Sequence, residues 1–426
     1  MKPNNFILYG DICYSQTPDK ITCMEDGYLI CTDGVSKGVF KSIPEQFKNL
    51  PIIDHKGKLI IPGLVDLHTH APQFSYRGLG MDLELLDWLN THAFPEESKY
   101  NHLDYAKKAY SAVVRDLITG PNTRACIFAT VHLPATMLLM DMLEESGLVC
   151  MVGKVNMDRN SPEILCEESA ARSAADTRHW LENTVGRYKN VTPIITPRFI
   201  PSCSDELMNE LALLQKEFNV PVQSHLSENP IEIDLVKELC PASVSYGDAY
   251  DQFGLFGGDA PTIMAHCVWP SESEIELLRK RQVYVAHCPQ SNENISSGIA
   301  PVRCFIDNDI RVGLGSDVAG GCHTSLFRAM TDAIQMSKLR WRLVDSSKAP
   351  LTLEEAFYLG TKGGGGFFGK VGSFEQGYEF DALVIDDQKL EPPFKINIAD
   401  RLARVIYLSD DRHICGKYIR GCSIIL

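Results

Sequence analysis

Residues 59–73 read LIIPGLVDLHTHAPQ, and the interpretation of the whole chain starts from this stretch. Its apolar residues, interrupted by a Pro-Gly pair, predict a buried strand that ends at His68 and His70. Because side chains along a strand repeat with a period of two, both imidazole rings point to the same side. Two neutral imidazoles aimed at one point suit a divalent metal. A His-x-His pair also arises by chance, so its meaning depends on the rest of the chain.

Composition limits the kinds of partner that the chain can bind. The 426 residues carry a formal net charge of -14 at pH 7, and the sequence pI is near 5.4. This argues against nucleic acid as a partner, because binding to a phosphate backbone is driven by clustered Lys and Arg. We therefore expect a small, neutral or cationic substrate. The length predicts two or three domains, or one large barrel with an additional domain.

Cysteine usage and hydropathy indicate the compartment. The 14 cysteines are spread from Cys13 to Cys422 without a Cys-x-x-Cys pair, and several lie within apolar runs. That pattern favours buried thiols in a reducing environment over a disulfide framework. The first residues contain an apolar run too short for a signal peptide, and no segment approaches the roughly 18 apolar residues of a membrane span. We expect a cytoplasmic protein that does not bind membranes.

Strand-like and helical runs alternate over residues 62–371, which predicts an α/β fold with a parallel (β/α)8 TIM-like barrel. The predicted strands end near His70, Thr130, Asp158, Phe199, His225, Val268, Pro289 and Val318. The clearest helical segments between them are 103–117, 168–188, 205–218, 231–239, 272–281 and 326–339. After a further helix over 353–361, the run Gly363–Gly366 predicts a tight loop.

The two ends of the chain resemble each other in composition. Short apolar runs and turn signals fill residues 1–61, with Asp-Gly pairs that are typical of hairpins. Runs of the same character recur in residues 372–426, at 380–386, 404–407 and 414–419, and predict strands. We therefore predict that both ends combine in one small β-sandwich domain beside the barrel domain of residues 62–371.

Polar residues follow the predicted barrel strands at the carboxyl ends, where barrel enzymes hold their active sites. His68, His70, His225 and Asp317 offer three neutral nitrogens and one carboxylate. This set suits one Zn²⁺ or Fe²⁺ ion with a position left open for water. Such a metal lowers the pKa of a bound water from about 15.7 to about 7, which generates a nucleophile at neutral pH.

The same strand ends supply candidates for proton transfer. Glu228 lies three residues after His225 and could protonate a ring nitrogen of the substrate and then the leaving group. His266 could orient the attacking water and stabilise the developing charge. His287 has no partner motif, so we interpret it as structural. The sequence leaves the roles of His132 and His323 open.

Five motifs, in order and spacing, resemble the amidohydrolase superfamily, specifically its deaminases with one metal ion: PGLVDLHTH, SHLSEN, MAHC, AHCPQSN and GLGSDVAGG. The fourth predicted strand lacks the terminal lysine that members with two metal ions carry in carboxylated form. Within the superfamily, residues 71–97, TPRF at 196–199 and SDDRHI at 409–414 resemble the guanine deaminases. The resemblance spans nearly the whole chain.

This resemblance implies hydrolysis of guanine to xanthine and ammonia, with one zinc ion per chain, iron being the alternative, and a homodimer. It implies that His68, His70, His225 and Asp317 bind the metal and that Glu228, His266 and Asp317 are catalytic. Gln73, Arg198 and Phe199 would recognise the purine, with Arg198 donating to its carbonyl oxygen, and Trp88 is a weaker pocket candidate. Further substrate contacts would come from His70, His225, Glu228, His266 and Asp317.

Two segments depart from the family pattern, and other functions remain open. Arg124 lies in GPNTRACIFAT, where the family usually has threonines, and we expect it to alter the strand or to contact a charged partner. The other departure is GGGGFFG at 363–369.

A related deaminase of 8-oxoguanine, another purine or pyrimidine, or an s-triazine would share the metal site and differ at Gln73 and Arg198. A non-catalytic scaffold is the alternative of another class, and the complete set of ligands argues against it. The His-x-Glu and Pro-Cys-x-x-Cys signature of the base-editing zinc deaminases is absent.

Overall fold

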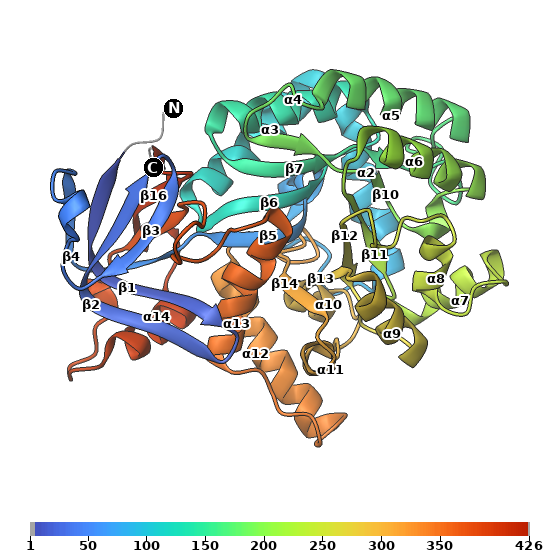
Figure 1. Ribbon diagram of the computed structural model, residues 1–426. Coiled ribbons are helices and arrows are strands. Elements are labelled where there is room, and N and C mark those ends of the chain that lie inside the picture. Colours follow the sequence, from blue (N-terminus) through green and yellow to red (C-terminus); the bar gives the residue numbers. More distant parts are fainter. Residues whose placement is uncertain (1–4, 425–426) are drawn as a thin grey trace.

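Parallel strands form the centre of the larger part of the molecule in the computed structural model, which describes residues 5–424 (Figure 1). One four-stranded parallel sheet has the order β5 (Leu64–His70), β6 (Asn122–Phe128), β7 (Val149–Gly153) and β9 (Val191–Pro193). A second has the order β11 (Val222–Leu226), β12 (Thr262–His266), β13 (Tyr284–His287) and β14 (Arg311–Leu314). These strands end within a few residues of the predicted positions, and the α/β class with parallel sheets is confirmed.

The two sheets contact each other at both of their edges. On one side a parallel bridge joins Ile195 to Val222, next to the short pair β8 (Val155–Asn156) and β10 (Thr196–Pro197). On the other side the Asp317 amide donates to the His68 carbonyl at 2.8 Å, and the His70 amide donates to the Val318 carbonyl at 3.1 Å. The last strand is therefore held against β5, the strand that carries the His-x-His pair.

Helices follow the strands and cover their outer side in Figure 1. The longer ones are α3 (Leu103–Thr119), α4 (Leu133–Ser146), α5 (Ala170–Thr184), α6 (Asp205–Phe218), α7 (Pro230–Leu239), α9 (Glu272–Arg281) and α12 (Leu326–Leu343). Shorter ones are α1 (Leu85–Trp88), α2 (Phe94–Glu97), α8 (Tyr246–Asp251), α10 (Pro289–Asn294) and α11 (Val302–Asp307). The six predicted helices are present. In α6, for example, Ser204 caps the first turn and leucines at helical spacing are buried.

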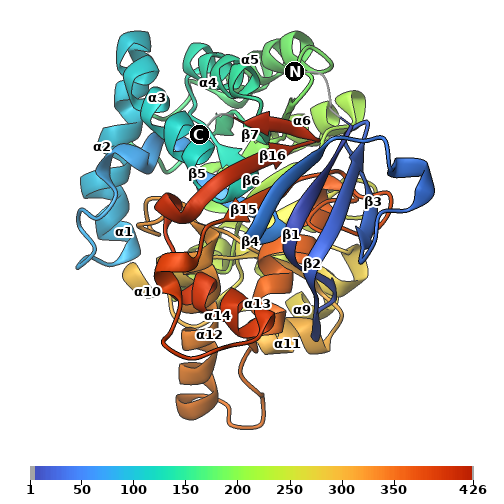
Figure 2. The ribbon, with the colours of Figure 1, turned by 90° about the vertical axis from the view of Figure 1, so that its left-hand side faces the viewer.

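Strands from both chain ends lie in one seven-stranded sheet, ordered β17-β16-β15-β4-β1-β2-β3 (Figure 2). Its members are β1 (Phe6–Thr17), β2 (Lys20–Thr32), β3 (Val35–Phe40), β4 (Ile52–Pro62), β15 (Ala382–Ile385), β16 (Ile414–Ile419) and β17 (Cys422–Ile424). Helices α13 (Leu353–Tyr358) and α14 (Ile398–Leu408) contact β1 and β2. The two chain ends therefore share a sheet, as expected.

The prediction of a strand at 404–407 is wrong, because these residues lie within α14. The Asn397 side chain accepts a hydrogen bond from the Asp400 amide at 2.8 Å and caps the helix. Ile398, Leu402 and Val405 are buried at helical spacing. Val405, Ile406 and Tyr407 suggested a strand, but the cap and the longer period decide the structure.

The tight loop predicted at Gly363–Gly366 is also wrong. The backbone continues from α13 through a π-helical turn (Leu359–Gly363) to a 3-10 turn (Gly366–Phe368). A Cβ atom on Gly364 would lie 3.2 Å from the Val65 carbonyl oxygen, and one on Gly365 would lie 2.3 Å from that of Val371. The glycines therefore allow this helical segment to pack directly against neighbouring backbone.

Buried charges join the first parallel sheet to the seven-stranded sheet. The Arg124 guanidinium, on β6, lies 2.6 Å from the Asp381 carboxylate and 2.8 Å from that of Glu379. Arg124 and Asp381 are both fully buried. The expectation that Arg124 contacts a charged partner is confirmed, since these acidic residues directly precede β15.

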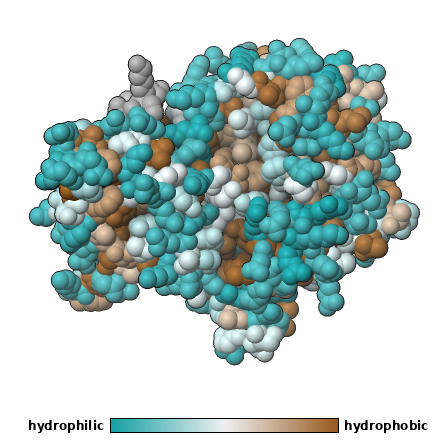
Figure 3. Space-filling view, viewed as in Figure 1, coloured by the Kyte–Doolittle hydropathy of each residue, from teal (hydrophilic) through white to brown (hydrophobic). Residues whose placement is uncertain are grey.

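Several of the cysteines are buried, as the apolar runs around them predict. Most of the face in Figure 3 is hydrophilic, with hydrophobic residues in separate patches. No disulfide joins cysteines in the described part of the chain. Among residues 5–424, no helix has both the length and the apolar character that crossing a membrane requires.

We expect Arg124→Met to lower the free energy of unfolding by about 3–5 kcal/mol, because it leaves the buried Asp381 carboxylate without its partner. Urea denaturation measures the effect. Arg178→Met is the matched control, because Arg178 makes a bidentate pair with Glu217, at 2.6 and 2.7 Å, on the exposed surface. Its loss should change stability far less. Equal losses in the two variants would contradict a structural role for burial of the Arg124 pair.

Candidate active site

A pocket lies at the carboxyl ends of the parallel strands. Polar residues from several strand ends line it, namely His70, Gln73, Arg198, His225, Glu228, Glu232, His266 and Asp317. The apolar part of its wall consists of Leu85, Leu86, Trp88, Leu89, Phe199 and Ile295. Helix α1 supplies much of the apolar wall, and the Leu85 amide donates to the Ile295 carbonyl at 3.2 Å. The pocket therefore combines a polar floor with an apolar cover.

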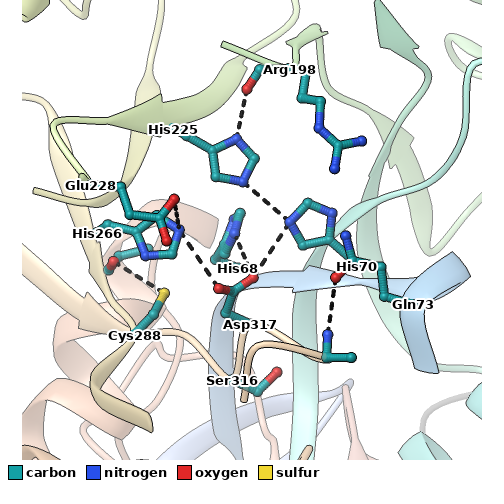
Figure 4. A network of polar contacts seen from close by, with 12 residues as sticks. His68, His70, Gln73, Arg198, His225, Glu228, His266, Cys288, Ser316 and Asp317 are labelled. Carbon is teal, nitrogen blue, oxygen red and sulfur yellow. Dashed lines mark hydrogen bonds and ion pairs between the residues drawn. The ribbon is translucent and has the colours of Figure 1, made fainter. Parts of the chain in front are cut away.

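Three imidazoles and one carboxylate meet beside this pocket (Figure 4). The Nε2 atoms of His70 and His225 are 3.2 Å apart. An Asp317 carboxylate oxygen lies 3.1 Å from His68 Nε2 and 3.4 Å from His70 Nε2. All four side chains are buried. The structure thus brings together the four residues for which the sequence predicts metal binding.

Backbone hydrogen bonds explain how these side chains are held. His68 and His70 alternate on β5, and His225 comes from β11. The buried Asp66 carboxylate accepts from the amides of His68, at 3.2 Å, and Ser316, at 3.0 Å. Asp66 therefore joins the strand of the His-x-His pair to the turn that presents Asp317.

Burial controls the protonation of the cluster. Desolvation lowers the pKa of His68 and lowers those of His70 and His225 well below the usual value. Burial disfavours ionisation of Asp317, but the neighbouring imidazoles outweigh it and hold its pKa well below the usual range. The rings are therefore neutral with available lone pairs, and the carboxylate is charged, as ligands of a divalent cation must be.

Two observations fit a metal ion at this cluster. Both ring nitrogens of His68 are buried without a hydrogen bond, although Nε2 lies 3.1 Å from the Asp317 carboxylate, and a buried ring nitrogen that makes no hydrogen bond is costly unless something else binds it. His225 Nδ1 lies 2.6 Å from the Arg198 carbonyl oxygen, to which it donates, so its Nε2 keeps a lone pair toward the other rings. His68, His70 and His225 could hold one divalent cation, and a second grouping of His68, His266, Cys288 and Asp317 shares His68 with them.

Glu228 and His266 form a second pair on the pocket wall. His266 Nε2 lies 3.5 Å from the Glu228 carboxylate and 3.6 Å from that of Asp317. Burial raises the pKa of Glu228, whose carboxylate also accepts from Ser297 Oγ at 3.1 Å. Burial works against the charged form of His266, but the two carboxylates outweigh it and raise its pKa. This pair can hold and release a proton close to Asp317.

Gln73 and Arg198 face the pocket and share a partner that sequence reasoning missed. The Glu97 carboxylate accepts from the Arg198 guanidinium at 2.6 and 3.1 Å and from Gln73 Nε2 at 2.9 Å. The Ala319 amide donates to the Gln73 carbonyl oxygen at 3.1 Å. The only signal for Glu97 in the sequence is a carboxylate that ends the FPEE segment.

Sequence reasoning also missed Asn292, and three of the candidate histidines lie outside the pocket. Asn292 Oδ1 accepts from His266 Nδ1 at 2.9 Å and orients that ring. The AHCPQSN motif, which contains Asn292, does not predict this contact. His287 is buried, and desolvation lowers its pKa to about 3, so it remains neutral. His132, His287 and His323 are not among the residues that line the pocket.

Comparison with known proteins places this geometry in a family. The model of the amidohydrolase family matches residues 59–421. Guanine deaminase of Dictyostelium discoideum is 40% identical over 408 residues, covering 94% of this chain and 88% of that protein. Guanine deaminase of Homo sapiens is 36% identical over 381 residues, covering 86% and 83%.

A solved structure matches this chain over nearly the whole length of both. The crystal structure of guanine deaminase from C. acetobutylicum, with guanine bound in its active site, matches with a TM-score of 0.96 and 47% identity, covering 99% of this chain and 100% of that one. The fold is therefore the amidohydrolase fold, which is of the TIM-barrel type. The chain belongs to the amidohydrolase family and, within it, to the guanine deaminases.

Proposed function

We propose that this chain catalyses the hydrolytic deamination of guanine to xanthine and ammonia. The observation that carries the proposal is the single pocket in which three neutral imidazoles and Asp317 lie beside the buried pair Glu228–His266 and face Arg198 and Gln73. Membership of the guanine deaminases supports the choice of substrate.

The proposed metal ligands are His68, His70, His225 and Asp317, which would hold one zinc or iron ion per chain. Support comes from the neutral rings, the charged carboxylate and its closeness to His68 Nε2 and His70 Nε2. When bound, the metal would supply an activated water molecule at neutral pH.

We assign the proton transfers to Asp317 and Glu228. Asp317 accepts a proton from the attacking water, since its carboxylate is ionised and lies next to His68 and His266. Glu228, with its raised pKa, donates its proton to a ring nitrogen of the purine. It then takes the proton of the added hydroxyl group as the new carbonyl forms and donates it to the departing amine, which leaves as ammonia. The proton that Asp317 took from the water returns Glu228 to its starting state. His266 faces both carboxylates and stabilises charge that develops between them.

Base recognition is assigned to Gln73, Arg198 and Phe199, with further contacts from His70, His225, Glu228, His266 and Asp317. Arg198 would donate to the carbonyl oxygen of guanine. Adenine carries an amino group at that position and would leave the buried guanidinium donors unpaired, which is a strong basis for rejection. Trp88 belongs to the apolar wall, which keeps water from the base.

Four broader features are part of the same proposal. We infer that the parallel strands close as a (β/α)8 barrel within residues 62–371, which the contacts of β14 with β5 support. Residues 1–61 and 372–426 would form the second domain, for which we predict a small β-sandwich, and the shared seven-stranded sheet supports the pairing of the two ends. The absence of disulfides among the described residues supports a cytoplasmic location. The homodimer is expected from the family resemblance.

We expect purified, zinc-loaded protein to convert guanine to xanthine, and not 8-oxoguanine, adenine or cytosine, in a spectrophotometric assay. Glu228→Gln should lower kcat by about 10²- to 10⁴-fold, because it removes the group that carries the proton. Its zinc content should not change. Turnover of another base instead of guanine would contradict the specificity assigned to Gln73 and Arg198.

Metal removal tests the ligand set separately. A chelator should lower the thermal midpoint of the wild-type protein, and added zinc should restore it, because an ion that binds only the folded state stabilises that state. His68→Ala should lose most of its zinc, as measured by elemental analysis after dialysis. His323→Ala, a histidine outside the pocket, is the control and should retain about one zinc per chain. Full zinc occupancy in His68→Ala would refute this ligand assignment.

A further inference from the structure

Glu97 is the hub of a buried hydrogen-bond network behind the proposed base-recognition residues. It lies at the end of α2 and is 3% exposed. One carboxylate oxygen accepts from Arg198 Nη1 at 2.6 Å, and the other accepts from both Arg198 Nη2, at 3.1 Å, and Gln73 Nε2, at 2.9 Å. A single side chain therefore contacts two of the residues that are assigned to the purine, Arg198 and Gln73.

These contacts leave Gln73 only one orientation of its amide. A carboxylate can only accept, so the Gln73 nitrogen must face Glu97. The Ala319 amide can only donate, so the Gln73 oxygen must face Ala319, at 3.1 Å. Without Glu97, the amide could turn and present an acceptor where the pocket now has a donor.

Arg198 is held in a comparable way. Glu97 takes two N–H groups in a bidentate pair, and the guanidinium has five in total, so others are left for a ligand. The pair is buried, at 5% and 4% side-chain exposure. Removing the carboxylate would leave an uncompensated cation next to the proposed metal ligands, and Arg198 would turn toward another acceptor or toward water.

Helix α2 contacts Arg198 through a second residue. The guanidinium carbon lies 5.0 Å from the centre of the Phe94 ring, at the first position of the same helix. This helix follows α1 and a π-helical turn (Leu89–Ala93), in the segment that also covers the pocket. The covering segment and the recognition residues are therefore one connected unit.

We propose that Glu97 is the positioning residue for base recognition, fixing the donor directions of Arg198 and Gln73 without touching the purine itself. This inference rests on the proposed function, because it assigns Arg198 and Gln73 to the substrate. It predicts that Glu97 acts on substrate affinity and on discrimination between bases more than on the chemical step.

The test is steady-state kinetics of Glu97→Gln with guanine on the zinc-loaded enzyme. We expect KM to rise between about 10- and 100-fold, which corresponds to loss of one charged hydrogen-bond partner, with a smaller fall in kcat and unchanged zinc content. Glu96→Gln is the matched control. Glu96 is also a buried carboxylate of α2, but it bonds Lys99 and Tyr105, away from the pocket, so KM should stay unchanged.

A double variant separates positioning from a structural role. If Glu97 acts through Arg198, Glu97→Gln combined with Arg198→Met should be no worse than Arg198→Met alone. If Glu97→Gln does not fold, the double variant can still be compared with Arg198→Met, because it no longer contains the unpaired Arg198 guanidinium. Additive losses, or an unchanged KM in Glu97→Gln, would overturn the proposal.

The failure of this inference can be told apart from failure of the proposed function. If the wild-type enzyme does not convert guanine, the proposed function fails, and crystal structures of the wild type and Glu97→Gln then decide the positioning role. Displaced Arg198 and Gln73 side chains in the variant would support it. Unchanged side chains would overturn it.

Discussion

The structure depends on keeping three imidazoles neutral and one carboxylate charged in a buried site. Desolvation drives the rings of His68, His70 and His225 to their neutral form, and the neighbouring His68, His266 and His70 hold the pKa of Asp317 well below its usual range. Such a cluster would be unstable if its side chains could move apart. Asp66 prevents this, because it binds the backbone on both sides of the cluster, at His68 and Ser316.

Metal binding and base recognition are assigned to different kinds of element, regular strands for the first and less regular segments for the second. Proposed metal ligands sit on β5, on β11 and directly after β14, where the backbone is fixed by its sheet. Residues assigned to the base, and the carboxylate of Glu97 that holds them, come from the ends of strands and from the short helices between β5 and α3. This division is typical of barrel enzymes, in which the strands hold the chemistry and the loops select the substrate.

The sequence predicted those parts that depend on local patterns. Period-two alternation placed His68 and His70 on one side of a strand, and helical spacing predicted helices such as α6 and α9 with their observed bounds. Two predictions were wrong for a common reason, the strand at 404–407 and the tight loop at Gly363–Gly366. In both, a short apolar or glycine-rich run was interpreted alone, while caps and close backbone packing outside the run determine the structure.

Contacts between distant segments could not be predicted from local patterns. Glu97 and Arg198 are 101 residues apart, and Arg124 and Asp381 are 257 apart. A single sequence shows a carboxylate or a guanidinium but not its partner, so the recognition network around Glu97 became visible only in the folded chain. Asn292, which orients His266 from helix α10, is a third example.

The most direct measurement is anomalous diffraction at the zinc edge from crystals of zinc-loaded Glu228→Gln grown with guanine. We predict one zinc peak per chain among His68, His70, His225 and Asp317, with the carbonyl oxygen of guanine against Arg198. Two metal ions, an ion held by His266 and Cys288 instead, or guanine bound away from Arg198 would contradict the account.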